Sequence, residues 1–223
     1  MKETGNISKS STQYKKNRLI TAFAILWLLL AGAGLWFVFD YENSPGIAAN
    51  PLAQFPADSK IPRVAGRPTL VMLAHPHCPC TRASIGELDL LMAQSQGLVN
   101  AYVLFLKPAG FADDWEKTDL WQSAANIPGV TVLQDNDGTE AEFFNAATSG
   151  QTFLYDATGR LLFQGGITSA RGHSGDNTGR DAIVSLLSQG KAEQTETAVY
   201  GCPLFNKDSD CRMGELNNET YNR

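Results

Sequence analysis

Two histidines and two cysteines stand together, with prolines between them, in the stretch LVMLAHPHCPCTRAS. The four side chains are His75, His77, Cys78 and Cys80. All four are ligands for soft or borderline metals, and the two cysteines are also groups that exchange disulfides. Two further cysteines, Cys202 and Cys211, follow near the C-terminal end. The sequence therefore offers thiol chemistry and metal binding as alternatives.

The residues around Cys78 favour a reactive thiolate. The apolar run before them predicts a buried strand, and Pro79 suits the first turn of a following helix, where its missing N–H is no loss. Cys78 is then expected at the N-cap, where unpaired backbone N–H groups and the positive end of the helix dipole stabilise a thiolate. An imidazolium at His77 would favour the thiolate further. We therefore predict Cys78 as the attacking thiolate, Cys80 as the resolving thiol and His77 as the residue that tunes them.

A disulfide between Cys78 and Cys80 is expected to be strained. Residues two apart on a helix point about 200° apart, because each step turns roughly 100°. A disulfide needs β-carbons about 3.5–4.5 Å apart. With Cys78 extended and Cys80 helical the bond is feasible, and because a strained bond is easily reduced, we expect an oxidant or isomerase rather than a reductase.

The C-terminal cysteines have two interpretations. Cys202 and Cys211, in GCPLFNKDSDC, are close enough in sequence for a structural disulfide that closes a short loop. Alternatively, Cys202 folds back as a resolving thiol for Cys78 or Cys80, or completes a metal site there.

Metal binding is the alternative function for the first cluster, whereas thiol exchange needs no cofactor. Copper or zinc would be held by a set that consists of His75, His77, Cys78 and Cys80. The third histidine, His173, lies in the glycine-rich stretch ARGHSGDNTGR. We expect it to be a loop residue before a helix that is capped by Asp176 or Asn177.

Residues 19–39, LITAFAILWLLLAGAGLWFVF, contain no charge and are long enough to cross a hydrocarbon core of about 30 Å. Residues 1–18 have a net charge of +4, and the chain from Asp40 onward has a net charge of −9. We therefore expect a single-pass protein of a bacterial inner membrane, with its N-terminus cytoplasmic and its C-terminal part periplasmic. A cleaved signal peptide is the alternative, with IAAN at 47–50 as a weak cleavage site. The acidic C-terminal part argues against nucleic-acid binding.

The rest of the chain predicts a linker over residues 40–55, a domain over residues 56–190 and a cysteine-containing extension over residues 191–223. Within the domain, the pattern is strand, helix, strand, helix, strand, helix, hairpin, helix. The second of these helices is expected to begin near Asp113 or Asp114. Parallel crossovers followed by an antiparallel hairpin predict an α/β sandwich.

This order, with a cysteine site at the start of the first helix, resembles the thioredoxin fold. The closer resemblance is to the membrane-tethered TlpA/ResA-like and peroxiredoxin-like proteins. These have an extra helix and strand before the hairpin, which PGVTVLQDNDGTEAEFFNA would supply here. More specifically, HPHCPCTRAS, LLFQGGITSARGHSGDNTGR and GCPLF resemble the pattern of RedB-type proteins. The resemblance implies a three-layer sandwich, with a mixed sheet and helices on both faces. It also implies exchange with extracytoplasmic protein thiols or a membrane redox partner.

The chain departs from that family in two places. Thr81 stands where the Cys-x-x-Cys motif has its second thiol, and no proline stands near Gly150 and Gln151, where the family has a cis-proline. Copper-delivery proteins of the Sco type share the fold, but their histidine near the hairpin has no match at residues 148–152. A non-enzymatic redox sensor or assembly factor is a further alternative.

Overall fold

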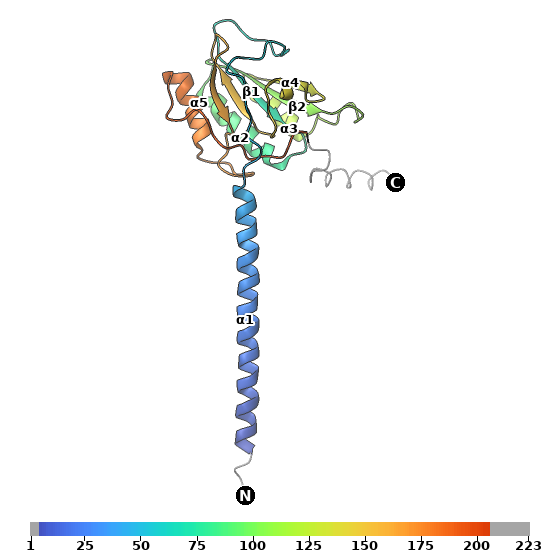
Figure 1. The fold of residues 1–223 in the computed structure, drawn as a ribbon, viewed down its shortest axis with the longest axis vertical. Helices are drawn as coiled ribbons and strands as arrows, with labels where there is room; N and C mark the ends of the chain where they lie inside the picture. Colours follow the sequence, from blue (N-terminus) through green and yellow to red (C-terminus); the bar gives the residue numbers. More distant parts are fainter. Residues whose placement is uncertain (1–4, 206–223) are drawn as a thin grey trace. The chain divides into compact units, whose positions relative to one another are not determined.

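The computed structural model describes the backbone of residues 5–205 and the side chains of residues 14–205 (Figure 1). The chain divides into a first unit that ends at Glu42 and a second unit that begins at Asn43. Each unit is described by itself.

The first unit is dominated by one helix, α1 (Gly5–Asn43). Its part from Tyr14 to Asn43 has a mean hydropathy of 2.3 over its most apolar window, and it is long and apolar enough to cross a membrane. The predicted span, residues 19–39, lies inside it. A membrane anchor and a signal sequence near the N-terminus share these features.

The second unit is built on a five-stranded sheet in the order β3-β2-β1-β4-β5. The strands are β1 (Thr69–Ala74), β2 (Asn100–Lys107), β3 (Val130–Asn136), β4 (Thr152–Tyr155) and β5 (Leu161–Gly165). β1 pairs with β2, and β2 with β3, in parallel, whereas β4 is antiparallel to both β1 and β5. The predicted parallel crossovers and closing hairpin are therefore confirmed.

Helices cover both faces of this sheet (Figure 1). The helices are α2 (Pro79–Gln94), α3 (Asp119–Ala125), α4 (Thr139–Phe143) and α5 (Thr178–Gln189). Apolar residues of α2, α3 and α5 pack in one cluster with Leu70 and Met72 of β1. The alternate residues Val71 and Leu73 pack on the other face, in a cluster that includes Ala141 of α4. β1 is thus buried on both faces as predicted, and the domain is a three-layer thioredoxin-like sandwich.

The expected start of α3 was wrong. The helix begins at Asp119, and residues 112–118 before it form turns instead. In these turns the Glu116 carboxylate is fully buried and lies 3.2 Å from the Lys107 Nζ at the end of β2. The Thr118 hydroxyl donates to the carbonyl of Pro76 at 3.1 Å. These contacts with distant residues hold the segment in turns, although its local sequence suits a helix.

The linker and the described part of the extension both pack on the domain, although we expected them outside it. The Gly46 N–H donates to the Val199 carbonyl at 2.8 Å, and Val199 and Leu204 are buried. Along β5, the Gln164 N–H donates to the Thr195 carbonyl at 3.0 Å. The extension therefore follows the edge of the sheet before it turns back towards α2.

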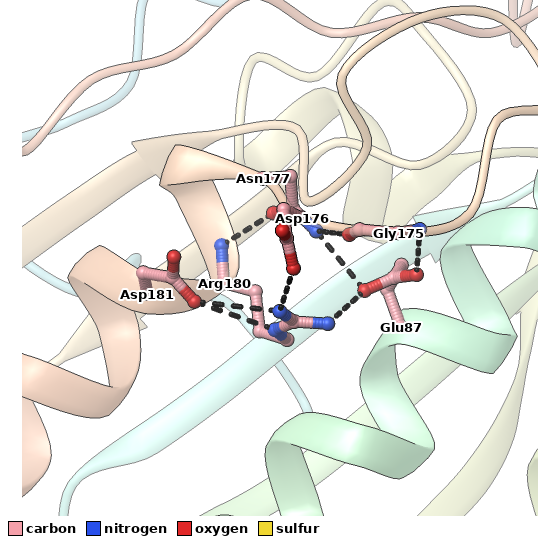
Figure 2. Close-up of polar contacts among 6 residues, drawn as sticks. All are labelled: Glu87, Gly175, Asp176, Asn177, Arg180 and Asp181. Carbon is pink, nitrogen blue, oxygen red and sulfur yellow. Dashed lines mark hydrogen bonds and ion pairs between the residues drawn. The ribbon is translucent and has the colours of Figure 1, made fainter.

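A buried polar network joins α2 to the loop before α5 (Figure 2). The Glu87 carboxylate, which is 1% exposed, accepts from Arg180 Nη1 at 2.6 Å and from the Gly175 N–H at 2.7 Å. Asn177 also donates to it at 3.0 Å, while its own side-chain oxygen accepts from the Arg180 N–H at 2.7 Å and caps α5. Of the two predicted caps, Asp176 and Asn177, the structure has Asn177, and the network fixes this loop against α2.

Replacing Glu87 with glutamine should destabilise the domain strongly, because the buried Arg180 guanidinium would lose its buried carboxylate partner and be left with the exposed carboxylates of Asp181 and Asp176. We expect a loss of about 3 kcal/mol in the free energy of unfolding, measured by urea denaturation. Asp176→Asn is the matched control, since the Asp176 side chain is fully exposed and its contact with Arg180 is long, at 3.9 Å. This substitution should change stability little. Equal stability of the two variants would contradict a structural role for the network.

Candidate thiol site

Cys78 is the N-cap residue of α2, as predicted. Its backbone is extended, with φ −84° and ψ 117°, and Pro79 is the first residue of the helix. The Cys78 carbonyl accepts the first helical bond, from the Thr81 N–H at 3.0 Å. Cys78 itself is fully buried. The thiol therefore lies at the positive end of the helix without contact with solvent.

The sulfur beside Cys78 belongs to Cys202. The two Sγ atoms lie 2.6 Å apart, and the Cys202 N–H donates to the Cys78 Sγ at 3.4 Å. Cys78 and Cys80 are buried, whereas Cys202 is partly exposed. Cys211 lies outside the described residues, so the Cys202–Cys211 disulfide stays a prediction. The second interpretation of Cys202, a residue that folds back onto the thiol site, is the one that agrees with this contact.

The three thiols differ in their tendency to ionise. The pKa of Cys78 is lowered, chiefly by the hydrogen bond with the Cys202 thiol and then by that with Cys80, although burial opposes both. For Cys80 the contact with Cys202 acts to lower the pKa, but Cys78 and burial outweigh it and the pKa is raised. Of the two helix cysteines, Cys78 is therefore the one whose thiolate is favoured.

The Cys202 segment is held by backbone pairing with the loop before β4. The Ser149 N–H donates to the Cys202 carbonyl at 2.8 Å, and the Leu204 N–H donates to the Ala147 carbonyl at 2.9 Å. Gly201 lies so close to the Ser149 carbonyl that a β-carbon there would clash with it. This short antiparallel contact aims the Cys202 side chain at α2.

Arg171 also holds the Cys202 segment in place. Its Nη1 donates to the Gly201 carbonyl at 2.9 Å, and its Nε donates to the Ser44 carbonyl at 3.0 Å. In the stretch ARGHSGDNTGR, our prediction concerned His173 and not Arg171. His173 is exposed in the loop. Arg171 is thus a site residue that the sequence did not identify.

Thr81, which stands where the Cys-x-x-Cys motif has its second thiol, connects two parts of the site. Its hydroxyl lies 2.7 Å from the Ser149 hydroxyl, which also accepts from the His75 N–H at 2.8 Å. Gly150, which follows Ser149 in the chain, has a positive φ of 89°, and its N–H donates to the Leu73 carbonyl at 2.7 Å. The loop that faces α2 is therefore held by hydroxyl and backbone bonds, and no cis peptide bond occurs within the described chain.

Both histidines of the first cluster contact Trp115. The buried His75 ring meets the indole edge-on with centroids 5.5 Å apart, and burial lowers the pKa of His75 to about 4. The exposed His77 ring lies 4.6 Å from the same indole, and its Nε2 is 3.1 Å from the Trp115 carbonyl. The His75 Nδ1 accepts from the His77 N–H at 3.2 Å. The two imidazoles thus take part in the packing of the loop beside the thiols.

The structure does not gather the predicted metal ligands into one site. Among residues 14–205, no three histidine, cysteine or acidic side chains are grouped in a way that would hold a metal ion. Of the four predicted ligands, the two cysteines lie with Cys202 and the two histidines lie against Trp115. The copper or zinc site stays a prediction.

Arg82 is separate from the thiols. It forms an ion pair with Asp119 at 2.5 Å, and both side chains are more than 60% exposed. The pair joins the first turns of α2 and α3 at the surface.

Comparisons with known proteins agree with the fold. A protein from Geobacillus kaustophilus, described as an uncharacterized conserved protein, matches with a TM-score of 0.53 at 19% identity, over 75% of this chain and 94% of its own. A hypothetical protein from Sinorhizobium meliloti matches with a TM-score of 0.53 at 21% identity, over 74% and 96% of the two chains. At these identities the likeness concerns the fold alone.

A secreted disulfide oxidoreductase of Mycobacterium tuberculosis, homologous to E. coli DsbE, has a TM-score of 0.40 at 18% identity, over 56% of this chain and 82% of its own. No family model matches the chain, and no curated protein matches it. The resemblance to RedB-type proteins stays a prediction.

Removing the Cys202 thiol should raise the pKa of Cys78, because the hydrogen bond between them is the main cause of its lowered value. In the reduced protein, the alkylation rate of Cys78 should change little between about pH 5 and pH 8, since the thiolate persists throughout. In Cys202→Ala the rate should fall towards low pH. Mass spectrometry measures alkylation of Cys78 at each pH. The slope of the rate against pH reports ionisation, even if the substitution also makes the thiol more accessible.

Cys202→Ser is the matched control for that measurement. Its hydroxyl keeps a hydrogen-bond donor in the same position, so its pH profile should lie between those of the wild type and Cys202→Ala. An unchanged slope in Cys202→Ala would refute the assigned cause.

Replacing Arg171 with methionine should loosen the segment over Cys78. A hydrogen bond from a charged donor contributes about 1.5–3 kcal/mol, so local opening, and with it the alkylation rate of Cys78, should increase about tenfold or more. Arg82→Met, which removes an exposed arginine from the same helix as the thiols, should leave the rate unchanged. Similar rates in both variants would show that Arg171 does not hold the segment.

Proposed function

We propose that this protein is a membrane-anchored, extracytoplasmic thiol–disulfide exchange protein whose redox pair is Cys78 and Cys202. The observation that carries the proposal is the 2.6 Å contact between their sulfur atoms at the N-terminus of α2. The helix end and the hydrogen bond from the Cys202 backbone N–H support a thiolate there.

The chemistry of the pair follows from this contact. A disulfide bond is about 2.05 Å long, so the two sulfurs need to move only a fraction of an ångström to form it. With Cys78 as a thiolate, its formation removes two electrons and one proton from the pair. A partner disulfide that takes up the two electrons, that proton and one more from solvent becomes two thiols. In the reverse direction, the protein's disulfide is reduced while two partner thiols are joined.

Cys202 replaces Cys80 as the resolving residue in this proposal. A bond between Cys78 and Cys80 would join two residues of one helix start, with the strain expected from their spacing. Cys202 approaches from a different segment and needs no change in α2. The raised pKa of Cys80 also disfavours the thiolate that a resolving residue needs for its attack.

The location agrees with this chemistry. The apolar part of α1 suits a membrane anchor, and the basic N-terminal segment with an acidic remainder suits a periplasmic domain. Disulfides persist in that compartment, and the accessible partners there are protein thiols or a membrane redox protein.

Disulfide mapping of the full-length protein in detergent micelles tests the proposal. After mild oxidation and alkylation of remaining thiols, mass spectrometry should find Cys78 joined to Cys202, and Cys80→Ser should leave this bond in place. The oxidised protein should convert a synthetic dithiol peptide to its disulfide, and Cys78→Ser should abolish this conversion. A bond from Cys78 to Cys80, or from Cys202 to Cys211, would contradict the assignment of the pair.

A further inference from the structure

We infer that Cys202, and not the helix cysteine Cys78, is the sulfur that an incoming partner thiol attacks. The mixed disulfide with the partner then forms at Cys202, and Cys78 is the leaving group. The inference rests on the proposed exchange function and adds to it the point of attack and the order of the steps.

Exposure is the first argument. Cys78 has no solvent-exposed surface, and Cys80 is only 7% exposed. Cys202 is partly exposed, so it is the only one of the three described cysteines that is not buried. An attacking sulfur must approach its target in line with the bond that breaks, on the side away from the leaving group. Cys78 has no exposed surface at which such an approach can begin, whereas Cys202 is partly exposed.

Cys78 is also the better leaving group, for a reason that depends on hydrogen bonds rather than on access. Thiol exchange is faster when the departing sulfur is well stabilised as a thiolate. Cys78 has the N-terminus of α2 and the Cys202 N–H to stabilise its negative charge. Access and leaving-group stability therefore favour the same direction, with attack on Cys202 and departure of Cys78.

The anchoring of the segment lets Cys202 carry a partner without leaving the site. Its carbonyl is bound by the Ser149 N–H, and the preceding carbonyl, of Gly201, is bound by Arg171. None of these bonds involves the Cys202 side chain. The backbone can therefore stay in place while the sulfur exchanges one bonded sulfur for another.

The oxidised protein exchanges its disulfide in two steps. A partner thiolate attacks the Cys202 Sγ, the bond to the Cys78 Sγ breaks, and Cys78 departs as a thiolate. A second partner thiol loses its proton to solvent and attacks the partner sulfur of the mixed disulfide, which releases Cys202 to take up a proton. The partner gains a disulfide and the protein gains two electrons. The partner class is thus a protein with two thiols that can reach each other.

The test uses the full-length protein in micelles with Cys80→Ser and Cys211→Ser, so that only Cys78 and Cys202 remain. The probe is a short biotinylated peptide with a single cysteine, which forms a mixed disulfide but has no second thiol to resolve it. The oxidised protein is mixed with reduced peptide, quenched with acid and mapped by mass spectrometry. We expect at least about tenfold more peptide on Cys202 than on Cys78. Equal labelling, or an excess on Cys78, would overturn the inference.

Single-thiol variants decide the matter if the internal disulfide does not form. In the same background, the two single thiols are compared at a pH at which both are ionised, so that the capture rates report access. Cys78→Ser should then capture the oxidised dimer of the probe peptide at Cys202 about tenfold faster than Cys202→Ser captures it at Cys78. A faster capture at Cys78 counts against the inference. An absent Cys78–Cys202 disulfide is a failure of the proposed function, whereas a disulfide that forms but is attacked at Cys78 is a failure of the inference alone.

Discussion

The close approach of two sulfur atoms from opposite ends of the domain sequence is the constraint on which the site depends. Cys78 ends the connection from β1 to α2, and Cys202 lies 124 residues later. Their meeting requires the helix start, the loop before β4 and the C-terminal segment to converge on one point. The hydrogen bonds of Ser149 and Arg171 make that convergence specific, because they fix the backbone on either side of the Cys202 side chain.

The helix side of this contact is rigid, whereas the Cys202 segment is held more weakly. α2 is fixed near its start by the hydroxyl contact between Thr81 and Ser149, and further along by the buried carboxylate of Glu87. The Cys202 segment is held mainly by a few backbone bonds and by one arginine. Since a buried ion pair resists separation far more than a short run of backbone bonds does, local opening of the site is expected to begin in the segment and not in the helix.

The parts of the fold that sequence reasoning predicted are those with local causes. An unbroken apolar run identifies β1, Pro79 places Cys78 at a helix N-cap, and Asn177 caps α5, because each signal acts within one or two turns of chain. The start of α3 was missed since it depends on the burial of Glu116 beside Lys107, which no local pattern reveals. Distant contacts override local propensity there.

The same distinction explains what was uncertain about the site. Cys202 had a nearby alternative partner in sequence, Cys211, and spacing alone favours short loops. Its contact with Cys78 depends on the path of the extension along β5, which is set by backbone bonds that carry no residue signature. Arg171 and Ser149 likewise act through backbone atoms far away in the sequence, so neither residue type marks its role.

The path of the extension along β5 has a consequence beyond the thiols. β5 ends the sheet, and an uncovered edge strand presents unpaired N–H and C=O groups on which other chains can add a strand and aggregate. Residues 195–198 occupy those groups through the carbonyl and N–H of Gln164 and the N–H of Gly166. The segment that leads to Cys202 therefore also covers the edge of the sheet. Truncation before residue 195 would expose an adhesive surface along with removing a thiol, whereas point substitution at Cys202 separates the two effects.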